Sequence, residues 1–159
     1  MKICELNTLR NLGLLSWGSL IVGKENGWIS KREIIECCDY ILGGSMDQNL
    51  IDVIILADSS DNDFMAAAYK NAGQFERPIE LDKWRLAFLL CIFNSPEGSV
   101  DKINKLQLVY SDFDYPEDME GCSIYSGIIV DPLVSMKGVI LSIARRLGVK
   151  NIEQGAIQK

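Results

Sequence analysis

The residues best suited to chemistry gather in one acidic segment around residue 115. It reads Y-S-D-F-D-Y-P-E-D-M from Tyr110 to Met119, and a further acid follows it. Carboxylates this close together could hold a divalent cation, act in acid–base catalysis or attract a positively charged partner. The candidate partner-binding residues are Asp112, Asp114, Tyr115, Glu117, Asp118 and Glu120.

The spacing of these carboxylates does not fit a known cation loop. An EF-hand needs acids or amides at its first, third and fifth positions and a glycine at the sixth, whereas Pro116 and Glu117 occupy the last two here. The D-x-D pattern of Asp112 and Asp114 is also disfavoured as the nucleophile loop of a phosphatase. A helical pattern, and not a hydrophobic strand, precedes it. We therefore expect no metal and no cofactor. A metal hydrolase using Asp112, Asp114, Glu117 and Asp118 stays an alternative.

The complete absence of histidine narrows the catalytic options further. Histidine is the usual general base near neutral pH, a common zinc ligand and the partner of most serine and cysteine nucleophiles. The glycines near the N-terminus do not form a phosphate-binding loop, since no G-x-x-x-x-G-K-[ST] occurs. We expect no catalytic residues and no enzymatic activity.

The charge distribution favours a basic protein partner. The chain has 22 acids and 16 bases, a net charge of −6. Six of the acids and none of the bases lie between Gln107 and Met136, so the other residues balance at 16 acids (22 − 6) and 16 bases. Nucleic-acid binding requires clustered lysine and arginine to meet the phosphates. We therefore expect that this protein does not bind nucleic acid.

A purely structural interpretation of the acidic segment is also open. In it, Pro116 fixes a turn, Asp114 caps a short helix, and the aromatic rings of Tyr110, Phe113 and Tyr115 pack inward. Under this interpretation the segment contributes to stability and not to binding. Mutations can separate the two, because loss of stability and loss of affinity are different measurements.

Periodicity and capping signals predict an all-α, or nearly all-α, single domain over residues 1–159. Ser30 and Glu33 form a capping-box pattern, for example, and Asp131-Pro132 is typical of a helix start. The segment 122–130 is rich in β-branched and aromatic residues, so it is either a short strand or a packed loop. Six or seven helices are expected, within residues 11–22, 30–42, 47–57, 61–72, 81–93, 95–109 and 131–146.

Two features bear on the compartment. The apolar stretch over residues 11–22 is too short to span a bilayer, so a buried first helix is the better interpretation and no membrane association is expected. The five cysteines are odd in number and include no C-x-x-C. This pattern is typical of reduced, core-type thiols, and it predicts a cytoplasmic protein.

A set of short motifs in this order resembles a known family. The set begins with Leu15-Ser16-Trp17-Gly18 and continues with Gly27-Trp28-Ile29-Ser30, a helix end at Leu56-Ala57, and Lys83-Trp84. It ends with the run from Leu108 to Met119. The chain resembles a family of small acidic bacterial proteins of unknown activity, over about residues 10 to 126. The Y-x-D-F-D-Y-P-E-D-M run is the most specific motif, and the helix from Pro132 onward has no match.

This family is similar to immunity proteins of polymorphic toxin systems, including contact-dependent growth inhibition. The resemblance implies a cytoplasmic protein that binds a delivered toxin domain and occludes its active site without catalysis. The implied partner is a basic toxin domain such as a nuclease, which an acidic surface would attract. The alternative binding function is a helical adaptor or regulator with another protein partner.

Overall fold

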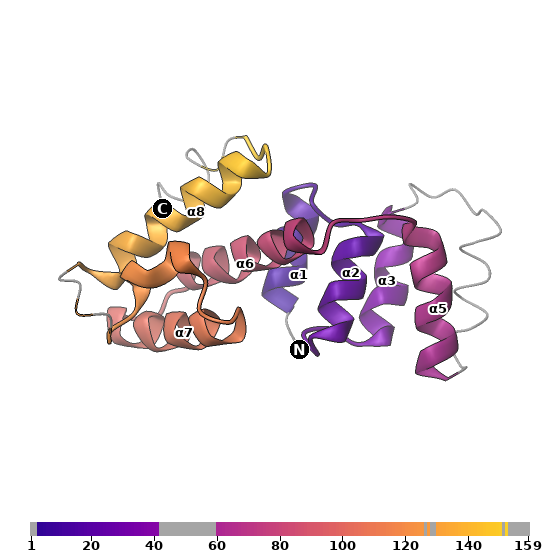
Figure 1. Ribbon diagram of the computed structural model, residues 1–159, viewed down its shortest axis with the longest axis horizontal. Helices are drawn as coiled ribbons and strands as arrows, with labels where there is room; N and C mark the ends of the chain where they lie inside the picture. The colour runs from indigo at the N-terminus through magenta and orange to yellow at the C-terminus, as the bar shows by residue number, and fades with distance from the viewer. Residues whose placement is uncertain (1–2, 42–59, 126, 128–129, 151, 153–159) are drawn as a thin grey trace. The chain divides into compact units, whose positions relative to one another are not determined.

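The computed structural model describes residues 3–41, 60–125, 127, 130–150 and 152, and their regular structure is entirely helical (Figure 1). The expected all-α fold is therefore confirmed. No strand occurs among the described residues of 122–130, and the helix expected over 47–57 lies outside the described residues. The helices are α1 (Ile3–Asn11), α2 (Trp17–Glu25), α3 (Lys31–Ile41), α5 (Asp61–Ala72), α6 (Arg77–Asn94), α7 (Ser99–Asp112), the 3-10 helix η2 (Glu117–Cys122) and α8 (Pro132–Arg146).

The chain divides into two compact units, Met1–Leu81 and Asp82–Lys159. The first unit holds α1, α2, α3, α5 and the first residues of α6. The second holds the rest of α6 together with α7, η2 and α8. The expectation of a single domain over residues 1–159 stays a prediction.

The apolar stretch over 11–22 is not one helix, which corrects the expectation for the first element. Here α1 ends at Asn11, and α2 begins at Trp17. Gly13 has a φ of 71°, which an L-residue rarely adopts and a helix cannot contain. Ser16 then starts α2 with a capping box, because its side chain accepts from the Ser19 N–H and Ser19 accepts from the Ser16 N–H.

The core of the first unit forms around α2, which packs against α3 and α5 (Figure 1). Helix α2 is apolar on every side, as expected for a helix with neighbours all round. Its Leu20, Ile21 and Val22 are fully buried, as are Ile34 of α3 and Phe64 of α5. Full burial of such side chains stabilises the fold by roughly 1.5–3 kcal/mol each.

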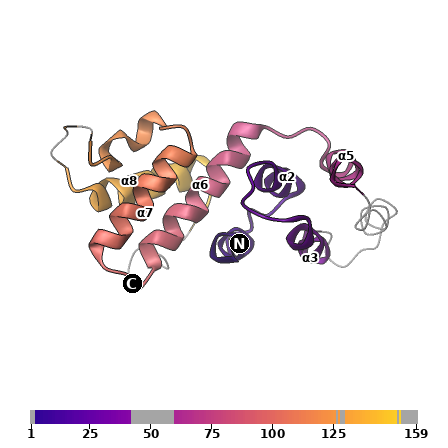
Figure 2. The same cartoon turned by 90° about the horizontal axis from the view of Figure 1, so that it is seen from below.

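In the second unit, the short helix η2 packs against α8 and α7 (Figure 2). Met119 of η2 is fully buried, as are Leu106 of α7 and Ile140 of α8. The approach of η2 to α8 is close at Gly121. A Cβ there would lie 2.8 Å from the hydroxyl oxygen of Ser135, so a side chain at this position would require the Ser135 side chain to move.

The predicted starts of α5 and α8 agree with the structure, whereas those of α6 and α7 do not, since α6 begins at Arg77 and not at residue 81. Helix α5 starts after Ser60, whose side chain accepts from Asp63 N–H, and α8 starts after Asp131 with proline in its first turn. The start of α7 at residue 95 was wrong, because α7 begins at Ser99. Ser95 instead follows the last residue of α6, and its N–H donates to the Ile92 carbonyl.

The cysteine prediction is correct for three residues and wrong for two. Cys37, Cys38 and Cys122 are free thiols, and all three are buried. Cys4 and Cys91 are disulfide-bonded, so the odd count and the spacing did not exclude oxidation of these two.

Candidate partner-binding surface

The candidate residues lie together in the second unit, where α7 ends and η2 begins. Asp112 is the last residue of α7, and Asp114 and Tyr115 form the turn that follows. The three remaining candidates, Glu117, Asp118 and Glu120, belong to η2. Nearness in sequence therefore becomes nearness in space.

The turn holds Asp114 and Tyr115 in an unusual backbone conformation. Their φ angles are 59° and 54°, in the left-handed region that costs an ordinary L-residue about 1–2 kcal/mol. Asparagine and aspartate tolerate this region better than a tyrosine does. The conformation is fixed by the Tyr115 N–H, which donates to the Tyr110 carbonyl at 2.9 Å.

The strained turn places the Tyr115 ring at the surface. The ring stands edge-on to Tyr110, with 5.1 Å between centroids and 88° between planes, yet Tyr115 is 61% exposed. The inward packing suggested for Tyr115 by the structural interpretation was wrong. Asp114 does not cap the following helix either, since η2 follows Pro116 without a side-chain cap.

Asp118 is an internal partner as well as a surface acid. Its carboxylate accepts from both terminal nitrogens of Arg85 and lies 3.7 Å from a terminal nitrogen of Arg146. Asp82 binds the same two arginines, at 3.0 and 3.1 Å. We call these four residues the arginine–aspartate cluster. The cluster joins η2 to α6 and α8 within the second unit.

The other four acids face solvent. Asp112, Asp114, Glu117 and Glu120 are all exposed, and no ion pair to them occurs within the described residues. Four carboxylates without compensating bases produce a negative local potential. Such a surface attracts positively charged groups over a long distance, and this attraction is strongest at low salt.

The described residues contain no group of three or more histidine, cysteine, aspartate or glutamate side chains arranged to hold a metal ion. The absence of a metal and of a cofactor stays a prediction. None of the described helices is long and apolar enough to cross a membrane.

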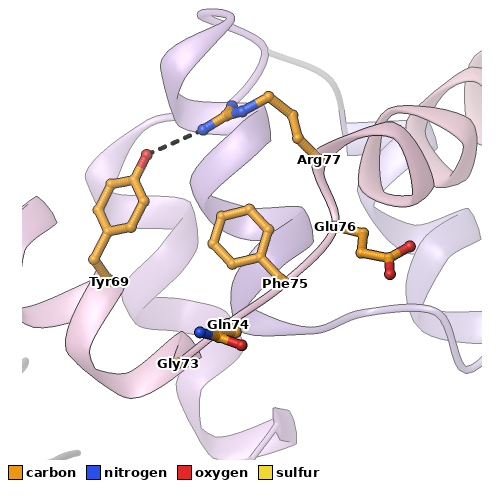
Figure 3. Close-up of a pocket in the computed structure, with 6 residues that line it drawn as sticks. All are labelled: Tyr69, Gly73, Gln74, Phe75, Glu76 and Arg77. Atoms are coloured by element: carbon orange, nitrogen blue, oxygen red, sulfur yellow. Dashed lines mark hydrogen bonds between the residues drawn. The ribbon is translucent and has the colours of Figure 1, made fainter.

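A second candidate feature is a pocket of about 630 Å³ in the first unit (Figure 3). Its lining residues are Tyr69, Gly73, Gln74, Phe75, Glu76 and Arg77. The Phe75 ring stacks on the Tyr69 ring, and the Arg77 guanidinium lies over Phe75, 5.9 Å from the ring centroid. The pocket is thus formed by the connection between α5 and α6.

The polar groups at this pocket are bound to one another. The Tyr69 hydroxyl and the Arg77 guanidinium both donate to the Glu25 carboxylate, and Arg77 also donates to the Tyr69 oxygen at 3.3 Å. Burial raises the pKa of Glu25, but the hydrogen bonds from Tyr69 and Arg77 outweigh it and hold this pKa below its usual value. The hydrogen bond to Glu25 raises the pKa of Tyr69. This arrangement braces the α5–α6 connection against the end of α2.

The Leu15-Ser16-Trp17-Gly18 motif has a structural role in the first unit. Ser16 caps α2, and its hydroxyl lies 3.3 Å from a carboxylate oxygen of Glu80. Glu80 is buried at 6% exposure. A Cβ at Gly18 would lie 2.9 Å from the other oxygen of Glu80, so glycine leaves room for this carboxylate.

Sequence reasoning missed several exposed apolar residues of the second unit. Leu108 is 63% exposed, Ile124 is 50% exposed and Tyr125 is 87% exposed. Leu108 is an apolar residue of α7, yet it faces away from Leu106 and Val109, which are buried. A helical projection of α7 alone could have separated Leu108 from these two.

Comparison with known proteins supports the first part of the resemblance. A protein-family model matches residues 6–127, a span that includes the acidic segment, and its description is "Uncharacterized protein conserved in bacteria (DUF2247)". No curated protein and no solved structure gives a significant match. Because the match covers well over half of the 159 residues, the chain belongs to the DUF2247 family of bacterial proteins.

Proposed function

We propose that this protein is an immunity protein, which binds a cognate toxin domain and neutralises it by occluding the active site. The observation that carries the proposal is the exposed acidic surface at the end of α7, where Asp112, Asp114, Glu117 and Glu120 surround an exposed tyrosine. Binding alone suffices for neutralisation. The lack of histidine is therefore no obstacle to this function.

The acidic surface suits a basic toxin domain such as a nuclease. An enzyme that binds nucleic acid presents lysine and arginine to the phosphates. The same side chains would meet the carboxylates of an inhibitor, which speeds encounter and covers the catalytic cleft. The carboxylates of the inhibitor would take the place of the nucleic-acid phosphates beside the basic residues of the toxin.

Tyr115 would contribute affinity to the interface, which exposed carboxylates alone provide only weakly. Charged groups at the rim of an interface mainly raise the association rate, whereas tyrosine is among the side chains that contribute most to affinity. Backbone strain is often found at binding sites, because the surrounding structure maintains it for function. Tyr115 fits this description, because it is exposed and because its own backbone and that of Asp114 are left-handed.

The proposal includes a cytoplasmic location, because a toxin delivered from a neighbouring cell acts there. The resemblance of the short motifs between Leu15 and Met119 to immunity proteins of contact-dependent growth inhibition implies the same location. The helical adaptor shares the surface and differs in its partner. The metal hydrolase would instead require a cation at the acidic segment.

Co-expression tests the proposal directly. The C-terminal domain encoded by the gene immediately upstream would be induced in a bacterial host, alone and together with this protein. Growth arrest by the domain alone and restored growth with the protein are the expected results. Unchanged arrest, with both proteins present in soluble form, would reject the immunity function.

Two controls complete the test. The triple variant Asp112→Asn, Glu117→Gln, Glu120→Gln should protect less well at the same expression level, since its surface potential is reduced. The triple variant Glu5→Gln, Glu36→Gln, Glu76→Gln removes the same charge from the first unit. Equal loss of protection in both variants would show that net charge, and not the acidic surface, matters.

A further inference from the structure

Helix α7 presents an uncharged stripe to solvent. Its members Val100, Asn104, Leu108 and Ser111 follow one another at spacings of four, four and three residues, so they share one side of the helix. All four are exposed, and Val100 and Leu108 are 73% and 63% exposed. A solvent-facing helix side normally carries charged residues, and here they flank the stripe.

The segment after η2 extends this stripe. The side-chain amide of Gln107 donates to the Cys122 carbonyl at 2.9 Å, and its oxygen accepts from the Ile124 N–H at 3.2 Å. These two bonds hold residues 122–124 against Gln107, which directly precedes Leu108 in α7. Tyr125 follows, with its N–H bound to the Ser123 hydroxyl.

We define the apolar face as Val100, Leu108, Ile124 and Tyr125. All four are at least half exposed. Single exposed apolar residues are ordinary, but two on one side of a helix and two on a segment hydrogen-bonded to that helix indicate an interaction site. The Gln107 bonds order a segment that contributes little to the core, since Ile124 and Tyr125 are themselves exposed.

The charge next to the apolar face identifies the class of partner. Asp112 is one helical turn after Leu108, and the exposed acids of the turn and of η2 follow it. Lys105, one turn before Leu108, is paired with Glu97. No base occurs between Gln107 and Met136. A second copy of this chain would bring two acidic surfaces together, and the resulting repulsion disfavours it. A basic partner gains from every one of these charges.

We propose that the apolar face binds a basic amphipathic segment of the partner. An apolar side chain of that segment contacts Leu108 and Tyr125, and its lysines or arginines meet Asp112, Glu117 and Glu120. The inference rests on the proposed function only in taking the partner to be a toxin domain. It assigns affinity to the apolar face and association rate to the acids.

A synthetic peptide tests the face without a toxin. The probe is a fluorescent amphipathic helix of leucine and lysine, and its binding to the full chain is followed by anisotropy. Leu108→Ser and Tyr125→Ser should each weaken binding about fivefold or more. The matched control is Val134→Ser, because Val134 is also 63% exposed but belongs to α8. Circular dichroism verifies that each variant is folded.

Two further peptides define the chemistry of the partner. A serine–lysine peptide lacks the apolar side, and a leucine–glutamate peptide reverses the charge; both should bind much more weakly than the leucine–lysine helix. Equal binding of either peptide, or equal weakening by Val134→Ser, would overturn the proposal.

The same variants separate this inference from the proposed function. Full protection against the toxin by the Leu108→Ser, Tyr125→Ser double variant would overturn the docking face and leave the immunity function intact. Peptide binding that depends on the apolar face, in a protein that protects against no upstream-encoded domain, would reject the immunity function alone.

Discussion

The guanidinium of Arg85 donates hydrogen bonds to both carboxylate oxygens of Asp118, one of them at 3.0 Å. The Arg85 side chain is only 7% exposed, so this pair is anchored inside the second unit. It divides the acidic segment into two functional classes. Asp118 holds η2 in place, whereas Asp112, Glu117 and Glu120 are available to a partner.

Removing the Asp118 charge should therefore cost stability. We expect Asp118→Asn to lower the free energy of unfolding by about 1–2 kcal/mol, less than for a fully buried pair because Asp118 is partly exposed and Asp82 still pairs with Arg85. Glu117→Gln should stay within about 0.5 kcal/mol. Urea unfolding measures both. Equal stability of the two variants would contradict the assignment.

The left-handed turn predicts opposite effects of two substitutions at Asp114. Valine is β-branched and disfavours a φ of 59°, so Asp114→Val should destabilise by about 1–2 kcal/mol. Glycine adopts this conformation freely, and Asp114→Gly should be neutral or stabilising. Thermal unfolding would show the difference. If both variants melted together, the turn would not have this geometry in solution.

Gly18 and Gly138 offer a matched pair within helices. Gly18→Ala would place a methyl group 2.9 Å from Glu80 and 3.0 Å from Phe75, so we expect a loss of about 1–3 kcal/mol. Nothing lies within 4 Å of a Cβ at Gly138 in α8, and Gly138→Ala should stabilise by up to about 1 kcal/mol. Chemical denaturation of both variants tests the close approach of Glu80 to α2.

Burial raises the pKa of the Cys122 thiol to about 11, and the nearby Asp118 adds to this effect. The unfolded chain loses the same proton near pH 9, so stability should fall as pH rises from about 9 to 11, by roughly 2–3 kcal/mol. Cys122→Ala should remove this part of the pH dependence. The measurement is the unfolding free energy of both proteins across that range; parallel curves would contradict it.

Local signals predicted those helices whose ends are set by one or two side chains. Ser60 caps α5 and Asp131 caps α8, so both starts were readable from the sequence. The break between α1 and α2 was missed because hydrophobicity is continuous through it. Gly13 and Ser16 mark the break, because Gly13 has a positive φ and Ser16 caps α2. The φ of a glycine, however, is decided by the whole fold.

The candidate surface stays a prediction, and only part of its arrangement could be read from the sequence. Nearness in sequence brought the acids together correctly. The pairing of Asp118 with Arg85 joins residues 33 positions apart, and no spacing rule reveals such a contact. The exposure of Leu108, by contrast, could be read from the helix period, because Leu108 projects from a different side of α7 than the buried Leu106 and Val109.

The proposed function requires that the acidic surface capture a basic toxin domain. Its most direct test is the association rate of the purified protein with the upstream-encoded domain, measured by stopped flow at several salt concentrations. We expect fast association that slows as salt rises, and a several-fold slower rate for the variant Asp112→Asn, Glu117→Gln, Glu120→Gln. A rate that is unchanged by the triple variant and independent of salt would contradict the claim.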